Sequence, residues 1–314
     1  MKLSIVATLY KSEVYVTEFC ERVSVVARTL TEDYEIVLVN DGSPDNSLQI
    51  AKQYADKHDN LIIIDLSRNF GHDKAMMTGL KYSSGDYIFL IDIDLEEEPE
   101  WLILFWERLK ESGVDVVYGV QSKRRGGVIE RFLGQLYYLA YRSLTGLQIP
   151  FNLVTARLMS RRYVDALTSF EEREMDLCGL WLITGFDQIS YPVKKHSSSQ
   201  TTYTFALKMN ALVDSITSFS SAPLVMIFYI GIAISLIAVF FIGYLIILWF
   251  FFEKPPSGWT SVMASIWLLG GLVIAFIGII GIYLSKVFSE AKHRPYTIIK
   301  DVYDSSYLKN MNNK

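Results

Sequence analysis

The chain has 314 residues, a formal net charge of −4 and 51% hydrophobic residues. This balance gives no positive field that would attract a nucleic acid, and the length suits one large domain with additional segments. The two cysteines, Cys20 and Cys178, are too far apart in sequence for a metal-ligand pair and are expected to be free thiols in a reducing compartment. The amino terminus lacks the apolar core of a signal peptide, so the leading domain is expected to stay in the cytosol.

Strand and helix patterns alternate along the first third of the chain. Strands are expected at residues 3–9, 34–39, 61–65, 87–91 and 114–120, and helices at 14–30, 47–58, 74–83 and 101–111. This alternation predicts an α/β fold with a doubly wound, mostly parallel sheet. The sequence has neither G-x-G-x-x-G after its first strand nor a P-loop, which argues against a dinucleotide dehydrogenase and a P-loop enzyme.

An acidic motif follows the expected strand at 87–91, where Asp92 and Asp94 are followed by Glu96. Open α/β sheets bind ligands at the carboxyl ends of their strands, so these acids are expected at a binding edge. Carboxylates completed by substrate phosphates are common ligands of magnesium and manganese. The alternative is an acidic, solvated helix start over residues 96–100.

A second acidic motif, Asp41 followed by Gly42, comes directly after the expected strand at 34–39. Such a carboxylate can bind the base or ribose of a nucleoside, or it can form a turn that caps the next helix. Together with Asp92 and Asp94 in an α/β domain, the motif favours nucleotide binding.

Two loops contain histidines whose function the pattern leaves open. His72 lies near the motifs and is interpreted as structural rather than catalytic. The polar run 194–204, which contains His196, is either a loop that closes over substrate or a linker.

Apolar residues recur at helical spacing in the segments 129–147 and 205–222. A stripe of this kind usually faces a protein core, but beside membrane spans a helix lying on the membrane surface is an equal alternative. We predict that 129–147 is an interfacial helix within a catalytic domain of residues 1–204, and that 205–222 is a juxtamembrane amphipathic helix.

Residues 223–252 and 259–285 carry no charged side chain. Each run exceeds the roughly 20 residues that cross a bilayer, so a hairpin of two transmembrane helices is predicted. Basic residues flank this hairpin before its first span and after its second, at Lys208, Lys286, Lys292 and Arg294. The positive-inside rule then places the catalytic domain and the tail 286–314 in the cytoplasm.

Six short stretches occur in an order typical of one family: 40–43 (Asn-Asp-Gly-Ser), 67–72 (Ser-Arg-Asn-Phe-Gly-His), 92–95 (Asp-Ile-Asp-Leu), 99–100 (Pro-Glu), 157–162 (Arg-Leu-Met-Ser-Arg-Arg) and 218–220 (Ser-Phe-Ser). This order resembles glycosyltransferase family two with the GT-A fold. With two C-terminal spans, the chain is similar to the polyprenyl-phosphate glycosyltransferases, which include dolichol-phosphate mannose synthase and bactoprenol glucosyltransferases. The resemblance covers about residues 3–290.

The resemblance implies a role for each matching residue. The nucleotide sugar would be bound by Tyr10, Glu13, Asp41 and Asp92. Magnesium or manganese would be held by Asp92, Asp94 and Glu96, the last of which replaces a usual Gln. Phosphates would be held by arginines, whose planar fork suits them, namely Arg124, Arg131, Arg157, Arg161 and Arg162. Of these residues, Asp94, Arg124 and Arg157 are expected to be catalytic, and each arginine has the alternative of a solvated surface charge.

The departures from the family pattern lie mainly on the acceptor side. Thr155 replaces an acidic residue, Cys178 replaces an arginine, and Thr202 replaces the lysine of a Ser-Lys-Tyr motif. The acids on the donor side are retained. The sugar and the acceptor are therefore left open.

The resemblance implies a metal-dependent, inverting hexosyltransferase that is a multi-pass protein of the inner membrane. It would transfer a sugar from a nucleotide donor, UDP-linked by expectation, to undecaprenyl phosphate on the cytoplasmic face for modification of a surface polysaccharide. A lipid phosphate with a second pKa of about 6 is largely dianionic near neutral pH and needs no strong general base. The expected partners are the donor, the lipid and the bilayer, and a homo-oligomer is left open.

Other functions remain as alternatives. The chain could be a degenerate transferase that acts as a nucleotide-binding scaffold, or a transferase with a glycan or protein acceptor. A processive polysaccharide synthase is disfavoured because there is no Gln-x-x-Arg-Trp motif and only two spans are expected. A transporter is disfavoured because no charged residue lies within the spans.

Overall fold

The computed structural model describes residues 1–121, 139, 141–147, 150, 152–173, 175–195, 213, 216–251 and 258–305. The chain divides into two compact units. The first contains residues 1–138, 147–204 and 294–314, and the second contains residues 139–146 and 205–293.

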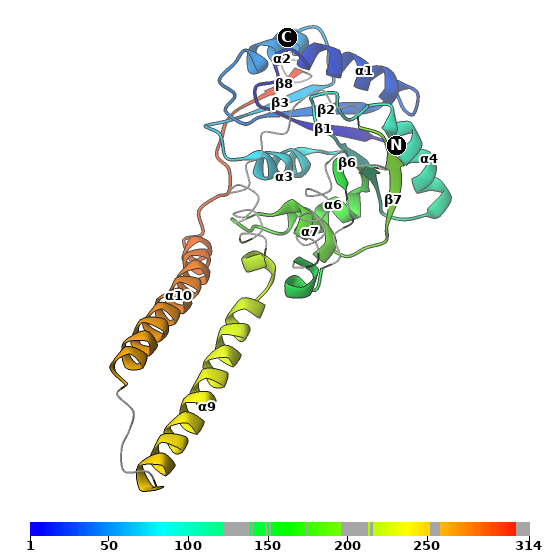
Figure 1. Ribbon diagram of the computed structural model, residues 1–314. Helices are drawn as coiled ribbons and strands as arrows, with labels where there is room; N and C mark the ends of the chain where they lie inside the picture. The colour runs from blue at the N-terminus through cyan, green and yellow to red at the C-terminus, as the bar shows by residue number, and fades with distance from the viewer. Residues whose placement is uncertain are drawn as a thin grey trace. The chain divides into compact units, whose positions relative to one another are not determined.

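A mixed sheet of eight described strands forms the centre of the first unit (Figure 1). The strands are β1 (Leu3–Leu9), β2 (Tyr34–Asn40), β3 (Leu61–Leu66), β4 (Tyr87–Leu90), β5 (Val116–Gln121), β6 (Leu153–Ser160), β7 (Gln188–Val193) and β8 (Ile299–Asp304), in the order β7-β5-β6-β4-β1-β2-β3-β8. Strands β3, β2, β1 and β4 are parallel neighbours and β7 is parallel to β5, whereas β6 and β8 run antiparallel to the strands beside them. The predicted α/β fold with a mostly parallel sheet is confirmed.

Helices cover both faces of this sheet. On one face lie α1 (Val16–Arg28), α2 (Ser47–Ala55) and α4 (Trp101–Ser112), and on the other lie α3 (His72–Tyr82) and α6 (Arg161–Thr168), followed by α7 (Leu177–Ile183) (Figure 1). Because both faces are covered, β1 and β2 are buried along their whole length. Their nearly continuous apolar sequences are typical of parallel strands in this position.

Three strands of the sheet, β6, β7 and β8, were not expected from the sequence patterns. Strand β6 inserts antiparallel between β4 and β5 and carries Arg157 opposite Leu90. Strand β8 pairs antiparallel with β3, with Tyr303 opposite Ile63. Residues 299–304 of the predicted cytosolic tail 286–314 thus form a strand of the sheet. Charged residues interrupt the apolar alternation of β6 and β8, so only pairing with distant strands reveals them.

A buried carboxylate joins three strands at the amino-terminal edge of the parallel sheet. Glu35 of β2 accepts hydrogen bonds from Ser4 Oγ of β1 at 2.6 Å and from Ser84 N and Oγ, just before β4, at 2.6 and 2.7 Å. Lys2 Nζ lies 2.9 Å from Glu35 Oε2. Burial by itself would raise the pKa of Glu35, but these hydrogen bonds lower the pKa overall. The ionised carboxylate therefore stabilises the folded state.

Glu35→Gln is expected to lower the free energy of unfolding by roughly 1–2 kcal/mol at neutral pH, because buried donors lose a charged acceptor. The folded-state pKa lies below the unfolded value of about 4.3, so this stabilisation is present above that pH and is lost as the pH falls through the folded-state pKa. Denaturant unfolding of the full-length protein in detergent, at neutral and acidic pH, should show a gap between variant and wild type that closes in acid. A gap of equal size at both pH values would contradict the role of the charge.

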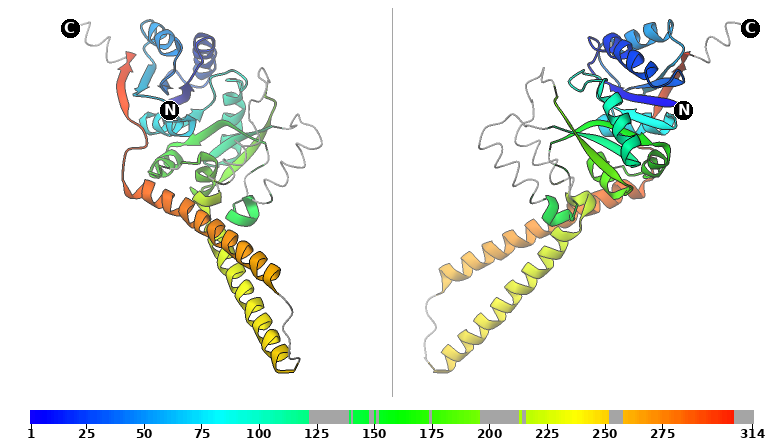
Figure 2. Two further views of the ribbon diagram at one scale, coloured as in Figure 1. Left: turned by 60° about the vertical axis from the view of Figure 1, so that its left-hand side comes forward. Right: turned by 90° about the vertical axis from the view of Figure 1, so that its right-hand side faces the viewer.

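The second unit contains two long apolar helices, α9 (Ala222–Phe251) and α10 (Trp259–Ala291), which contact each other (Figure 2). By length and composition, each of these helices is able to cross a membrane. Their large apolar side chains are widely exposed, as at Phe240, Ile274 and Leu284. Exposed apolar surface on this scale is typical of a lipid-facing or protein-facing region.

Polar contacts connect the residues before α9 with the last turns of α10. Tyr283 Oη donates to the Ser220 carbonyl at 2.6 Å, and Lys286 Nζ donates to Ser218 Oγ at 2.8 Å. Ser220 Oγ also donates to the carbonyl of Leu144. Residues 213 and 216–219 are helical, but most of the two predicted amphipathic segments, 129–147 and 205–222, lies outside the described residues.

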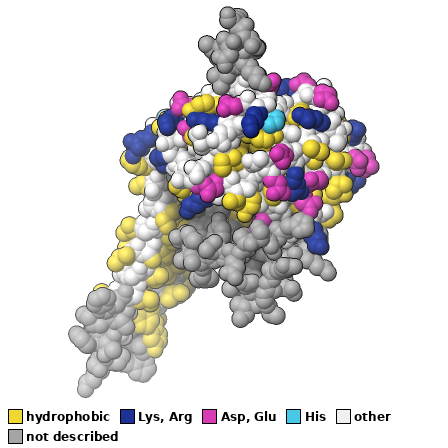
Figure 3. Space-filling model, turned by 90° about the horizontal axis from the view of Figure 1, so that it is seen from above, with side chains coloured by type: hydrophobic (Ala, Val, Ile, Leu, Met, Phe, Trp, Pro, Cys, Tyr) yellow, Lys and Arg dark blue, Asp and Glu magenta, His cyan; other side chains and the backbone are white. Residues whose placement is uncertain are grey.

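Figure 3 shows the charged side chains on one face of the first unit. Acidic and basic side chains are interspersed there, with apolar side chains between them. Such a surface produces no extended field of one sign.

Candidate active site

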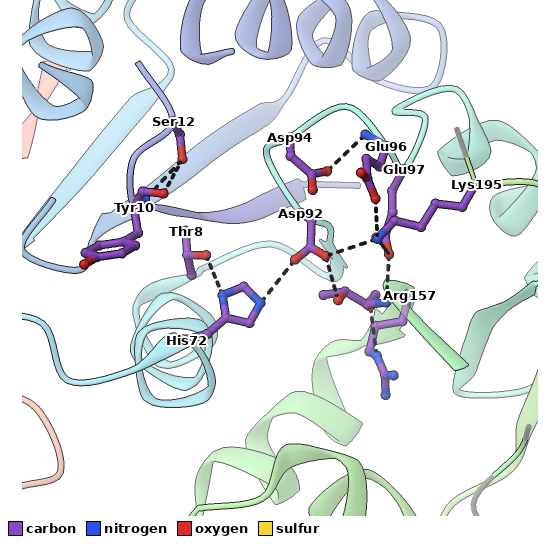
Figure 4. Close-up of polar contacts among 11 residues, drawn as sticks. Thr8, Tyr10, Ser12, His72, Asp92, Asp94, Glu96, Glu97, Arg157 and Lys195 are labelled. Carbon is purple, nitrogen blue, oxygen red and sulfur yellow. Dashed lines mark hydrogen bonds and ion pairs between the residues drawn. The ribbon is translucent and has the colours of Figure 1, made fainter. Parts of the chain in front are cut away.

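Acidic and hydroxyl side chains gather at the carboxyl ends of the parallel strands β1 and β4 (Figure 4), and Asp41 directly follows the neighbouring strand β2. Leu9 of β1 pairs with Asn40 of β2, and Val6 of β1 pairs with Leu90 of β4. The residues after these strands therefore reach the same edge of the sheet. Asp41 and Asp92 belong to this edge, as the sequence predicts.

Asp92 is held by groups from several parts of the chain. Thr155 Oγ1 of β6 donates to Asp92 Oδ2 at 2.9 Å, and His72 Nε2 lies 3.2 Å from Asp92 Oδ1. Burial alone would raise the pKa of Asp92, but His72, Lys195 and Thr155 lower the pKa below its usual value. Asp92 is therefore ionised and fixed in orientation. Thr155, which stands where the family has an acidic residue, serves here as a hydrogen-bond donor to it.

His72 connects the ends of β1 and β4. Its Nδ1 lies 3.0 Å from Thr8 Oγ1, and its Nε2 faces Asp92 (Figure 4). The backbone at Gly71, with φ of +102°, turns the chain so that His72 begins α3. His72 thus positions an acid of the site, which agrees with its interpretation as a structural residue and explains why it lies beside the motifs.

The loop after β4 brings further carboxylates close to Asp92. Asp94 Oδ1 accepts a hydrogen bond from Glu96 N at 3.0 Å. Leu95 has a φ of +58°, a strained conformation for a leucine that turns the chain sharply between Asp94 and the two glutamates. Burial and the charge of Asp92 raise the pKa of Asp94.

Glu97 is the most deeply buried acid of the loop and was not singled out by the sequence motifs. Its side chain is fully buried, and its Oε1 accepts a hydrogen bond from Thr155 N at 3.0 Å. Burial, followed by the charge of Asp92, raises the pKa of Glu97 to about 7. Its Oε2 is buried without a hydrogen-bond partner among the described residues. Glu97 has the same residue type as its neighbours, so only its inward orientation distinguishes it.

Lys195, two residues after β7, brings a positive charge close to three of these acids. Its Nζ lies 3.5 Å from Glu96 Oε2, 3.6 Å from Glu97 Oε1 and 4.0 Å from Asp92 Oδ2 (Figure 4). Burial would lower the pKa of Lys195, but the surrounding carboxylates raise it. The sequence places Lys195 at the start of a polar run. It gives no indication that Lys195 reaches the loop of residues 92–97 after β4, which we call the acidic loop.

The acidic loop suits a hard divalent cation by the chemistry of its donors. Asp92, Asp94, Glu96 and Glu97 offer carboxylate oxygens, which are the ligands that magnesium and manganese prefer. Burial, and after it the charge of Asp92, raises the pKa of Asp94 and of Glu97, so a bound cation would stabilise the charged form of both carboxylates. Within the described part of the chain, however, no three His, Cys, Asp or Glu side chains are already arranged as a metal site. The residues fit the cation in kind, while Lys195 provides the counter-charge.

Asp41 joins the loop after β2 to the loop that leads into α3. Its Oδ1 and Oδ2 accept hydrogen bonds from Phe70 N at 2.7 Å and Gly71 N at 3.0 Å. Gly42 has a φ of +58°, and a Cβ atom there would lie 2.5 Å from the backbone of Arg68 and Asn69. The turn therefore requires glycine. Asp41 therefore orders the loop that leads into α3. A turn that caps the next helix in the chain would instead have served α2.

Tyr10 and Glu13 lie in the loop after β1. Glu13 Oε2 accepts hydrogen bonds from Asn46 N at 3.0 Å and Asn46 Nδ2 at 3.1 Å, and Glu13 N donates to Asp45 Oδ2 at 3.1 Å. The Tyr10 side chain is 45% exposed at the same edge of the sheet. Glu13 thus fixes the loop, and the ring of Tyr10 remains open to a planar ligand.

Arg157 is a fully buried cation next to the acidic loop. It is 1% exposed, its Nε donates to the Thr155 carbonyl at 3.3 Å, and its guanidinium carbon lies 2.9 Å from the centre of the Trp181 ring. Its Nη2 is buried without a hydrogen-bond partner among the described residues. Burial lowers the pKa of Arg157 to about 10, so it remains charged at neutral pH. A buried guanidinium with a free donor is prepared to bind an anion.

Arg161 and Arg162 do not reach the site. Because β6 runs antiparallel to β4, these residues lie near the amino end of β4, several residues away from Arg157 along the strand. Arg161 Nε donates to the Gly85 carbonyl at 2.9 Å. Arg162 forms a two-point contact with the carboxylate of Asp115, at 2.5 and 2.6 Å. Both have structural partners at the opposite edge of the sheet.

Four of the residues named in the sequence analysis have no described position. Arg124, Arg131 and Thr202, and the histidine at 196, lie outside the described residues. Cys178 is described as a free thiol in α7, and burial raises its pKa to about 12. Its thiol is therefore neutral and adds no charge beside Arg157.

Comparisons with known proteins identify the family of this chain. Residues 4–168 match the family model described as glycosyl transferase family 2. A Mycobacterium tuberculosis (strain CDC 1551 / Oshkosh) protein described as "Putative glycosyltransferases" is 50% identical over 97% of this chain and 89% of its own length. The bactoprenol glucosyl transferase of Shigella phage SfV is 30% identical over 96% of this chain and 99% of its own length.

A solved structure described as "Crystal Structure of a Mycobacterial Protein" has 20% sequence identity and a TM-score of 0.51, over 69% of this chain and 74% of that chain. At this identity the likeness concerns the fold. The resemblance read from the motifs is confirmed by the family model and by relatives that match nearly the whole chain. The chain is therefore a glycosyltransferase that belongs to glycosyl transferase family 2.

Proposed function

We propose that this glycosyltransferase transfers a hexose from a nucleotide sugar, UDP-linked by our expectation, to a polyprenyl phosphate such as undecaprenyl phosphate. The observation that carries the proposal is the position of Thr155 between two charged centres. Its hydroxyl donates to Asp92 and its carbonyl accepts from Arg157. A cluster that suits a cation and a buried guanidinium that suits a phosphate are thus adjacent, as a transfer between two phosphate compounds requires.

The donor side of the proposed site comprises Tyr10, Asp41 and Asp92, with Asp94 and Glu96 toward the diphosphate. The exposed ring of Tyr10 is suited to stacking on a base. Asp92, held by His72 and Thr155, is suited to bind a ribose hydroxyl or a metal ion. Glu13 fixes the loop that carries Tyr10 through its hydrogen bonds with Asn46.

Asp92, Asp94, Glu96 and Glu97 would hold a magnesium or manganese ion. When bound, such an ion neutralises the donor diphosphate and improves it as a leaving group. Burial and the charge of Asp92 raise the pKa of Asp94, so a nearby cation would stabilise its charged form.

On the acceptor side, Arg157 would bind and orient the lipid phosphate with its free Nη2. A phosphate oxygen forms a bond to the anomeric carbon while the bond from that carbon to the donor diphosphate breaks. The nucleoside diphosphate leaves with the electron pair, and displacement from the opposite side inverts the anomeric centre. The phosphate is already largely dianionic, because its second pKa is about 6, so no general base is required.

The membrane location follows from α9 and α10 in this proposal. Their exposed apolar surfaces would lie in the bilayer, where a polyprenyl tail also resides. Lys286, Lys292 and Arg294 at the end of α10 favour a cytoplasmic position for the flanks and the catalytic unit. The printed name of the phage relative, bactoprenol glucosyl transferase, supports a lipid-linked acceptor.

A transfer assay tests this function. Full-length protein in detergent is given undecaprenyl phosphate, manganese or magnesium, and labelled UDP- or GDP-sugars one at a time. We expect label from one donor to enter the organic phase, to stop with EDTA and to return with added divalent cation. Transfer that persists in EDTA would contradict the metal assignment. Nucleotide binding without label in the lipid would favour the scaffold alternative, and label in a glycan or protein fraction would favour another acceptor.

A further inference from the structure

Lys195 reaches the acidic loop from β7, the strand at one edge of the described sheet, whereas the loop itself follows β4. It follows β7, whose last residue, Val193, pairs with Gln121 of the parallel strand β5. The carboxyl ends of β5 and β7 therefore point toward the edge at which the loop after β4 lies. From there the Lys195 side chain, 23% exposed, extends to Glu96, Glu97 and Asp92.

The contacts of Lys195 with these acids are electrostatic rather than close hydrogen bonds. The three distances from its Nζ are 3.5, 3.6 and 4.0 Å, whereas a charge-assisted N–H···O bond measures about 2.7–2.9 Å. A lysine held by charge alone at several oxygens is readily displaced. Its flexible stem also allows the ammonium to move away without unfolding the strand.

The carboxylates around this ammonium need a positive charge in any state of the protein. Glu97 is fully buried, its Oε2 lacks a hydrogen-bond partner among the described residues, and Asp92 and Asp94 lie in the same loop. Burying several carboxylates without a counter-charge is costly. Besides Lys195, the positive groups near this cluster within the described residues are His72, whose Nε2 lies 3.2 Å from Asp92 Oδ1, and Arg157, whose charge interacts with that of Glu97.

A divalent cation and the ammonium compete for the same oxygens. Magnesium binds oxygen ligands at about 2.0–2.1 Å and demands an octahedral arrangement, which the carboxylates cannot adopt while the ammonium lies among them. We infer that Lys195 is a tethered counter-ion of the acidic loop, which neutralises it before the metal arrives and is displaced by the metal. Lys195 thereby sets the metal affinity of the enzyme. The inference rests on the proposed metal-dependent function and adds a residue that the family motifs do not assign.

The test measures metal binding without turnover. Manganese is titrated into full-length protein in detergent, with no sugar donor or lipid acceptor present. Electron paramagnetic resonance measures the concentration of manganese that remains free in solution. Lys195→Met is expected to bind manganese about tenfold more tightly than wild type, because a competing charge near the metal is removed. Lys194→Met is the matched control. Lys194 is exposed, and its substitution changes the net charge by the same amount. The manganese affinity of the Lys194→Met protein should equal that of wild type.

Equal or weaker manganese binding by Lys195→Met would overturn the inference and leave the metal assignment intact. Absence of manganese binding by wild type and by both variants would instead overturn the metal assignment of the proposed function, and the inference with it. The two failures are therefore distinguishable.

A second measurement uses wild-type protein and so does not depend on the folding of a variant. The rate of acylation of each lysine by an amine-reactive reagent is measured by mass spectrometry with and without magnesium. Magnesium should increase the labelling of Lys195 several-fold and leave that of Lys194 unchanged, because the displaced ammonium enters solvent. Unchanged labelling of Lys195 at a saturating magnesium concentration would overturn the inference.

Discussion

Asp94→Ala is expected to lower the rate of sugar transfer by roughly a hundred- to a thousandfold, the usual effect of losing one group that stabilises charge in the transition state. Asp94 lies at the sheet edge, where its carboxylate makes one described hydrogen bond, to Glu96 N. Burial and Asp92 raise its pKa, so at neutral pH its charge opposes folding. The substitution should therefore leave the melting temperature unchanged or slightly raise it.

The measurement for Asp94→Ala combines the initial rate of transfer with a thermal melt in the same detergent. Asp86→Ala is the matched control, because Asp86 is an exposed acid at the other end of β4. This control should keep the wild-type transfer rate. A folded Asp94→Ala protein with wild-type transfer would refute the assignment of Asp94 to the metal or diphosphate.

Arg157→Met is expected to lower kcat/KM for the lipid phosphate by about a hundredfold or more, because a charge-assisted contact with the acceptor is lost. Its effect on stability should have the opposite sign to that of an ordinary buried arginine. Arg157 has no carboxylate hydrogen-bonded to it among the described residues, and Nη2 is unpartnered. The cost of burying such a charge is several kcal/mol, which exceeds the roughly 2 kcal/mol of a desolvated cation–π contact like the one with Trp181. Methionine of similar length should therefore be neutral or stabilising.

Arg162→Met is the complementary control, because Arg162 lies in α6, just after β6 ends. Arg162 holds the buried carboxylate of Asp115, so its loss should reduce stability while transfer stays close to wild type. Thermal melts and acceptor titrations of both variants give the comparison. Loss of stability together with loss of transfer in Arg157→Met would indicate a purely structural arginine and would contradict its role at the phosphate.

The parallel core of the fold is predictable from the sequence because its signals are local. The apolar runs of β1, β2 and β3 indicate strands buried on both faces, and the spacing of α1 to α4 indicates helices that cover them. The acids at the end of β4 follow from the same reasoning, because any residue directly after a parallel strand lies at the carboxyl edge. The charge-free runs that form α9 and α10 depend only on composition and length.

The completed site depends on contacts between distant parts of the chain, which no local pattern contains. Asp92 meets Thr155 and His72 only because β6 inserts beside β4 and α3 begins next to β1. The antiparallel direction of β6 also separates Arg157 from Arg162, although the two are close in sequence.

By itself, the sequence determined the α/β core, the acidic edge, the family and the two apolar helices, because periodicity and residue type act over a few positions. Only the tertiary structure decided that Glu97 is the inward acid, that Lys195 neutralises the loop and that Arg157 is buried with a free donor. These properties arise from burial and from charges brought together by strand pairing, and burial is a property of the packed chain rather than of any segment of it.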